Sequence, residues 1–348
     1  MLSLGKLAHG QQEYYLDTVA KGAEEYYTGG KEAPGEWQGG AAARLGLFGE
    51  FDADALSDVL GHRDPASGEP LSSGRSHPHV AGFDATFSAP KSVSLLFALG
   101  RPEVSNEVRN AHDAAVRDAL AVLEGEASVG RRGRGGAATV SGDGFVAAAF
   151  RHRTSRAAEP QLHTHVVIAN LVHSVDDERW TALDARPLYR WARPVGHLYE
   201  AQLRWELTNR LGVAWRPVRN GIADVAGIPQ PAIDAFSTRR RQIAQHLDAH
   251  GESSARAAQV AAYATRSTKD ADATPETLVD GWCSRAAAHG LDDRSLARVL
   301  ERQPATEPPA PGSAEAEALF CRLASPVGLT AHRSNFGRGD VLEAICNA

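Results

Sequence analysis

At 348 residues the chain is long enough to bury a full hydrophobic core, which excludes a small disulfide-stabilised module. Its formal net charge of −6 gives no support to nucleic-acid binding at the level of the whole chain, so any basic surface must be local. Three widely spaced cysteines, the lack of an apolar signal segment and the lack of any bilayer-length apolar stretch indicate a soluble protein of a reducing cytoplasm.

The N-terminal part of the chain is predicted to begin with a helix over residues 11–27, which ends at a pair of glycines. A loop rich in Gly, Ser and Pro follows over 64–79. Residues 81–87 indicate a strand, and a helix over 90–99 opens on a proline, which a first helical turn tolerates. The first helix carries four of the seven tyrosines in two adjacent pairs: Tyr14, Tyr15, Tyr26 and Tyr27.

The middle of the chain alternates between helical and strand-like patterns. Apolar residues recur at helical spacing over 106–123, and the run RRGRGG at 131–136 indicates a basic flexible turn. Two strands are then expected at 144–153 and 163–172, joined by a polar loop over 154–162. These two strands are predicted to pair as a hairpin.

The C-terminal part is predicted to be helical up to a proline-rich break. Pro-rich segments favour extended chain without packing, so QPATEPPAPG marks a linker. We therefore expect one large domain over 1–302, a linker over 303–313 and the start of a further region over 314–348. The helices expected before the linker are 191–211, 231–249, 255–264 and 277–288.

Three histidines on the predicted hairpin form a candidate metal site. Successive side chains of a strand alternate between faces, so His163 and His165 project to the same side. His152 on the partner strand can face them. Three neutral imidazoles bind a divalent ion and leave coordination positions open, as a catalytic metal requires. Asp84 on the strand before can hold a ligating imidazole by its second ring nitrogen.

Other interpretations of these residues stay open at this point. The histidines can be ordinary strand residues that make hydrogen bonds, and Asp84 can be a surface aspartate. Histidine ligands alone do not select the metal, because they suit Zn, Ni, Cu and Fe as well as harder ions. Phosphate chemistry would favour Mg or Mn, with Zn or Ni as alternatives.

The clustered tyrosines suggest covalent chemistry. A phenol is a known nucleophile but a weak one at its free pKa of about 10, so it needs a base or a metal. A metal that polarises and orients a phosphoryl group provides that help from the side of the electrophile. The alternative is structural, since paired aromatic residues often pack a helix against the core.

The order of these motifs resembles the MobF (TrwC/TraI-like) conjugative relaxases, a branch of the HUH endonuclease superfamily. The resemblance covers about residues 1 to 300. It implies an α+β fold in which an antiparallel, palm-like sheet carries the histidine hairpin, with flanking helices and a helical C-terminal lobe that closes over single-stranded DNA. The motifs that carry it are the two tyrosine pairs, GFDATFSAPKSVS, FRHRTSR and PQLHTH.

The resemblance also assigns roles to residues. Tyr14 matches the nucleophile that nicks one strand at a plasmid transfer origin and is left joined to the 5′ phosphate, although Tyr15 remains an alternative. Tyr26, paired with Tyr27, matches the tyrosine of a later strand transfer. Asp84 matches an acidic residue near nucleophile and metal. The metal ligands are His152, His163 and His165.

This chain departs from the usual pattern in three respects. Its tyrosine pairs lie further apart than in the best-known members. Thr164 stands between the two histidines in place of the bulky apolar residue typical of the superfamily, a change that this relaxase branch tolerates. Residues 329–345 resemble the opening of a helicase region, but no GxxxxGK[ST] phosphate loop is present, so no ATPase activity is expected. The sequence is accordingly interpreted as a fragment, a truncated gene or a motorless version.

Single-stranded DNA at a transfer origin is the expected partner, with accessory relaxosome and coupling proteins as further candidates and a bacterial cytoplasmic location. Basic residues concentrate near the candidate site despite the negative net charge, and Trp180 or Trp191 could stack unpaired bases if they do not belong to the core. Competing functions are a zinc hydrolase, a rolling-circle replication initiator and a non-catalytic DNA-binding module. The candidate DNA-binding residues are Arg153, Arg156, Arg266 and Lys269.

Overall fold

A computed structural model describes residues 1–8, 35–72, 80–155, 157–251, 275–300, 310, 312–331 and 334–347. The helices expected over 11–27 and 255–264 lie outside these residues, as does most of the expected linker. Within the described part, no helix is both long and apolar enough to cross a membrane.

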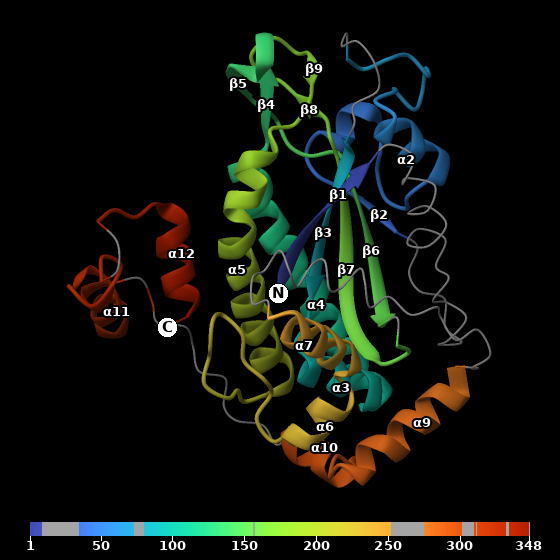
Figure 1. Ribbon diagram of the computed structural model, residues 1–348, viewed down its shortest axis with the longest axis vertical. Helices are drawn as coiled ribbons and strands as arrows, with labels where there is room; N and C mark the ends of the chain where they lie inside the picture. The colour runs from blue at the N-terminus through green and yellow to red at the C-terminus, as the bar shows by residue number, and fades with distance from the viewer. Residues whose placement is uncertain are drawn as a thin grey trace.

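A five-stranded antiparallel sheet forms the centre of the molecule (Figure 1). Its presence together with the helices around it confirms the predicted α+β class. The hairpin prediction was correct, but the loop between its strands is shorter than expected and covers only 155–159. In spatial order the strands are β1 (Leu2–Ala8), β3 (Val80–Ser88), β7 (Pro160–Ala169), β6 (Ala147–Thr154) and β2 (Glu36–Gln38).

Alternation along β7 divides the sheet into two faces. Leu162, Val166 and Ile168 are fully buried in the main core on one face. His163 and His165 occupy the intervening positions, are only partly buried, and therefore point to the opposite face. The period-2 pattern of the sequence thus sets which side of the sheet can carry chemistry.

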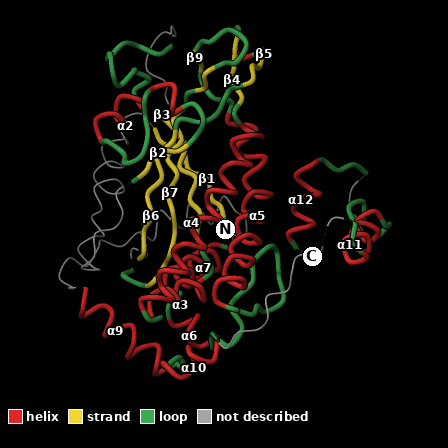
Figure 2. Tube along the Cα trace, turned by 180° about the vertical axis from the view of Figure 1, so that it is seen from behind, coloured by secondary structure: helices red, strands yellow, loops and turns green. Residues whose placement is uncertain are grey.

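Three helices cover the apolar face (Figures 1 and 2). They are α3 (Lys91–Leu99), α4 (Pro102–Ala127) and α5 (Ala185–Leu211). Proline begins or precedes the first two, where its missing N–H is harmless, and Gly212 ends the third in the left-handed conformation at φ 66°. The buried side chains of these helices pack on the sheet and form the larger core.

A second, smaller core covers the other face at the end away from the histidines. It contains η3 (Ala42–Leu45) and α2 (Ala53–Leu60), whose first turn is capped by the Asp52 carboxylate accepting from the Ala55 amide at 2.8 Å. Val59 and Leu60 of this helix pack on Ala148 and Val167 of the sheet, and all four are at most 1% exposed.

Two short hairpins extend from one end of the main sheet. One pairs β4 (Val129–Arg132) with β5 (Ala138–Ser141), and the other pairs β8 (Val172–His173) with β9 (Trp180–Thr181). The prediction of a flexible turn over 131–136 was therefore wrong in part, because its first two arginines belong to a strand. Only 133–136 turn, and three glycines there have φ between 70° and 76°.

The described residues of the C-terminal lobe form the helices α6 (Gln230–Ala235), α7 (Thr238–His250), α9 (Pro275–Ala288) and α10 (Asp293–Val299). The single helix expected over 231–249 is interrupted. Phe236 is fully buried in the main core, and the Ser237 hydroxyl donates to the Ile233 carbonyl at 2.7 Å, so the chain turns before α7 begins.

Of the last two helices, α12 (Arg338–Cys346) lies beside α5, and α11 (Ala314–Ala324) lies on the side of α12 away from α5 (Figures 1 and 2). Residues around the end of α12 bond to this side of the domain. Asn347 accepts from the Gly221 amide at 2.6 Å and donates to His197 Nδ1 at 2.9 Å. Arg204 donates to the Cys346 carbonyl at 2.9 Å. The division into a domain, a linker and a further region stays a prediction.

Candidate metal centre

The three histidines predicted to form a metal site converge in the structure. Each offers one ligand atom, and these atoms all lie within 4.8 Å of one another. The register explains the convergence, because His152 pairs directly with His163, and His165 is two residues further along the same face. The three ring centroids are 5.1 to 5.2 Å apart, so the rings surround a common point.

Hydrogen bonds at the second ring nitrogen orient two of these imidazoles. His163 Nδ1 lies 2.8 Å from the Gln161 carbonyl oxygen, which can only accept, so this nitrogen carries the proton. His165 Nδ1 lies 3.0 Å from both carboxylate oxygens of Asp84. In both arrangements Nε2 is the ring nitrogen that would bind a metal, and the bonds at Nδ1 are the outer contacts that metal-binding histidines typically make. The site therefore fits a divalent cation by ligand type, spacing and outer contacts.

Asp84 lies on β3 beside the histidine pair. Asp84 is 9% exposed, and the Thr86 hydroxyl donates to its carboxylate at 3.1 Å. That hydroxyl also lies 3.1 Å from His165 Nδ1. Asp84 and Thr86 thus form a small polar cluster that holds one imidazole in place.

A second polar cluster lies directly behind the histidines, on the helix-covered face. Thr164 Oγ1 is 2.8 Å from His112 Nε2 on α4, and His112 Nδ1 is 2.8 Å from the Tyr199 hydroxyl on α5. Burial lowers the pKa of His112 well below its usual range and raises that of Tyr199 well above its own, so both are neutral. The threonine that departs from the superfamily pattern therefore has a structural role.

This cluster was missed at the level of sequence. His112 falls within the predicted helix over 106–123, at a position on its apolar face. A lone histidine among core residues was the available signal, but its partners are 52 and 87 residues away in the sequence.

A cavity of about 210 Å³ also opens on the helix-covered side, between β2, β6 and α4. Its lining includes Arg117 and the ion pair between Arg151 and Asp113, whose charged atoms are 2.5 Å apart. The imidazoles point to the other face of the sheet, so this cavity is separate from the metal centre.

The remaining predicted site residues are placed only in part. Arg153 does not join the histidines, since its guanidinium lies over the Phe97 ring at 5.7 Å on the opposite face. The two tryptophans proposed for base stacking, Trp180 and Trp191, are partly buried and pack against the cores. The other predicted site residues lie outside the described part of the chain: Tyr14, Tyr15, Tyr26, Tyr27, Arg156, Arg266 and Lys269.

Comparison with known proteins gives a consistent result. Residues 8–289 match the TrwC relaxase family. The multifunctional conjugation protein TraI of Escherichia coli is 32% identical over 354 residues, a match that covers 98% of this chain but only 19% of that relative. The chain thus spans about a fifth of the length of the curated relative.

Solved structures of the conjugative relaxase TrwC are also similar. A copper-bound complex with transfer-origin DNA has a TM-score of 0.73 and 33% identity, and the match covers 84% of this chain and 99% of that one. A complex with a 27-mer DNA comprising the recognition hairpin and the cleavage site has a TM-score of 0.70 and 32% identity with the same coverage.

Proposed function

This chain belongs to the TrwC relaxase family, and from that premise we propose that it nicks and rejoins one DNA strand at a plasmid transfer origin during conjugation. The observation that supports this most is the group of three convergent histidines on adjacent strands, two of them already oriented by outer hydrogen bonds. Such a site is suited to a metal that keeps open positions for substrate oxygens.

His152, His163 and His165 would hold the cation. When bound, a divalent ion there would polarise a phosphoryl oxygen and orient the scissile phosphate, and phosphate chemistry favours Mg or Mn over the Zn and Ni alternatives. Asp84 keeps the His165 ring in the orientation that presents Nε2 to the site.

A tyrosine of the N-terminal pairs is the proposed nucleophile, with Tyr14 as the first candidate and Tyr15 as its alternative. Its phenol oxygen forms a bond to phosphorus as the bond to the 3′ oxygen breaks. The phenolic proton is lost and the leaving 3′ oxygen gains one, so the products are a 5′-phosphotyrosyl strand and a free 3′ hydroxyl. Rejoining reverses these steps without ATP, and Tyr26 or Tyr27 would serve a second transfer.

Basic residues outside the metal site are proposed to bind the strand. Arg156, Arg266 and Lys269 stay candidates for phosphate contacts, whereas Arg153 could reach the strand only from the face opposite the histidines. We also propose a cytoplasmic location, the absence of ATPase activity, and accessory transfer proteins as additional partners.

The decisive experiment looks for a covalent adduct. The protein is incubated with Mn²⁺ or Mg²⁺ and end-labelled single strands from the transfer origin near its gene, and the products are separated on a denaturing gel. We expect an adduct that disappears with a chelator and in the His163→Ala variant. For the tyrosine substitutions described next, Tyr189→Phe is the matched control, because Tyr189 is 44% exposed on α5 and belongs to no tyrosine pair.

Replacing Tyr14, Tyr15, Tyr26 and Tyr27 together by Phe should abolish the adduct. An adduct that persists in this variant would refute tyrosine catalysis. Strand cleavage without any adduct, unaffected by loss of the four phenols, would instead support a metal-dependent hydrolase.

A further inference from the structure

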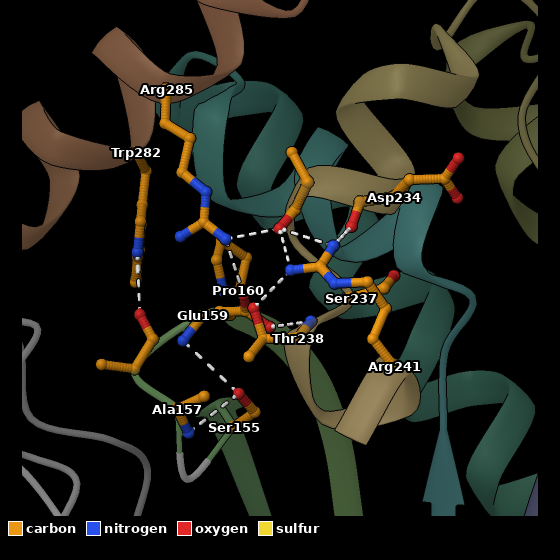
Figure 3. A network of polar contacts seen from close by, with 12 residues as sticks. Ser155, Ala157, Glu159, Pro160, Asp234, Ser237, Thr238, Arg241, Trp282 and Arg285 are labelled. Carbon is orange, nitrogen blue, oxygen red and sulfur yellow. Dashed lines mark hydrogen bonds and ion pairs between the residues drawn. The ribbon is translucent and has the colours of Figure 1, made fainter. Parts of the chain in front are cut away.

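The tip of the metal hairpin is enclosed by the C-terminal lobe (Figure 3). Residues 155–159 connect β6 to β7, and the pair Thr154 with Pro160 is the last in the register before this turn. The pair before it joins His152 to His163, two of the candidate metal ligands. A contact that fixes the tip therefore lies one register pair away from two of the candidate metal ligands.

Glu159 is the main link between the tip and the lobe. Its side chain is only 2% exposed, and both carboxylate oxygens are occupied. Arg285 of α9 donates to Oε1 at 2.7 Å, and the backbone amide of Thr238, the first residue of α7, donates to Oε2 at 3.1 Å. A carboxylate at the start of a helix also interacts favourably with the helix dipole.

Further contacts seat the same turn. The Trp282 indole of α9 donates to the Ala158 carbonyl at 2.9 Å, and Lys91 of α3 donates to the Pro160 carbonyl at 2.6 Å. Ala158 has a φ of 52°, a conformation that residues other than glycine adopt only where their surroundings impose it. Arg285 in turn stacks over the Phe236 ring at 4.4 Å.

Polar contacts at its first turn hold helix α7 in place. None of its residues is buried, so the Glu159 link to Thr238 and the Arg241 guanidinium donating to the Asp234 carbonyl orient it more than packing does. Its first turn carries Arg239, Arg240 and Arg241, the last of which folds back to the Thr238 hydroxyl at 2.9 Å. A basic helix turn next to the hairpin tip is suited to contact the phosphates of a strand.

We propose that Glu159 is a positioning residue for strand cleavage. Through the Thr238 amide and Arg285 it fixes α7 and α9 on the hairpin tip, so that a strand bound by the lobe meets the histidine centre in one register. The proposal rests on the proposed function. The ion pair is buried only on the Glu159 side, since the Arg285 side chain is 38% exposed. Such a pair adds little to stability compared with apolar packing, and its value here is that it specifies one arrangement of two elements.

The test compares variants of Glu159 with a matched control. Glu159→Ala removes both contacts, Glu159→Gln removes the charge and keeps one of the two acceptor oxygens, and Trp282→Phe removes an independent contact to the same turn. Asp177→Asn is the control, because Asp177 forms an equally direct pair with Arg132, at 2.5 Å, on a hairpin at the opposite end of the sheet from the C-terminal lobe (Figure 1). Each protein is assayed at saturating end-labelled DNA with Mn²⁺ in single-turnover conditions.

Glu159→Ala should cleave about ten- to a hundredfold more slowly at saturating DNA, since small misplacements of reacting groups have effects of this size. It should also yield products cut one or more nucleotides away from the main site. The cleavage rates of Glu159→Gln and Trp282→Phe should lie between those of Glu159→Ala and the wild type. Asp177→Asn should match the wild type in both cleavage rate and cleavage position. Mn²⁺ affinity, measured by calorimetry, should be unchanged in all four variants.

Two results would overturn the proposal. One is a lower melting temperature in Glu159→Ala while the folded protein still cleaves at the wild-type rate and position. The other is a parallel loss of Mn²⁺ affinity, which would mean that Glu159 supports the hairpin itself. If Glu159→Ala does not fold, the Gln and Phe variants carry the same test. Failure of the wild type to form any adduct would instead count against the proposed function.

Discussion

Replacing Thr164 by Val should destabilise the protein although the two side chains have nearly the same shape. The hydroxyl lies 2.8 Å from Nε2 of His112, a residue with no exposed surface. The substitution removes one hydrogen bond and leaves a buried polar nitrogen without this partner, which costs about 1–3 kcal/mol. For a domain of about 300 residues, a loss of 2 kcal/mol corresponds to a melting temperature lower by roughly 3 °C.

Urea unfolding followed by circular dichroism measures this effect. Thr164→Ser is the control, since it keeps the hydroxyl and loses only a methyl group, at a cost of about 1 kcal/mol. A triple variant with Thr164→Val, His112→Leu and Tyr199→Phe removes every polar partner at once and should recover much of the stability lost in Thr164→Val. A Val variant as stable as the wild type, or more stable than the Ser variant, would refute this account of the cluster.

Three further predictions concern other parts of the molecule. Asp84→Ala should weaken Mn²⁺ binding about 10- to 100-fold, as measured by calorimetry. Asp84→Asn should weaken it less, because Asn still offers an acceptor to His165. Equal Mn²⁺ affinities of the wild type and Asp84→Ala would contradict the role of Asp84 in orienting His165. Burial lowers the pKa of Lys91 from 10.5 to about 8, so between these values the unfolded chain holds more protons and stability should rise with pH. The free energy of unfolding of the wild type, measured from pH 7 to 10.5, should rise by up to about 3 kcal/mol, and that of Lys91→Met should not show this rise. Identical pH profiles for the two proteins would exclude Lys91 as the cause. Asn347→Ala should speed hydrogen exchange across α12 but not in β7, since Asn347 bonds to both Gly221 and His197; uniform exchange changes would contradict such local anchoring.

Local patterns were sufficient to predict the metal hairpin and the face of its histidines. Strand alternation is a property of neighbouring residues, so β6, β7 and the placement of His163 and His165 could be inferred without tertiary information. The α+β class was implied by the family resemblance that these motifs carry. The approach of Asp84 to His165 required the pairing of β3 with β7, which the sequence alone could suggest only through the family resemblance.

Long-range contacts account for what was missed. β1 pairs with a strand that begins at Val80, and nothing near Leu2–Ala8 indicates that partner. Phe236 interrupts an otherwise helical pattern because the core takes up its ring. Glu159 was interpreted as part of a polar loop, and its burial is caused by helices at least 79 residues further along the chain.

The position of β7 in the sheet has a consequence for how the protein acquires its metal. β7 is hydrogen-bonded to β3 on one side and to β6 on the other, so its amides should belong to the last part of the fold to open. The histidines are therefore held in place whether or not an ion is bound, and ions can enter and leave without unfolding. Imidazole ligands accept several divalent ions, and affinity alone does not determine which ion a protein carries in the cell, so we expect the metal supply to decide it.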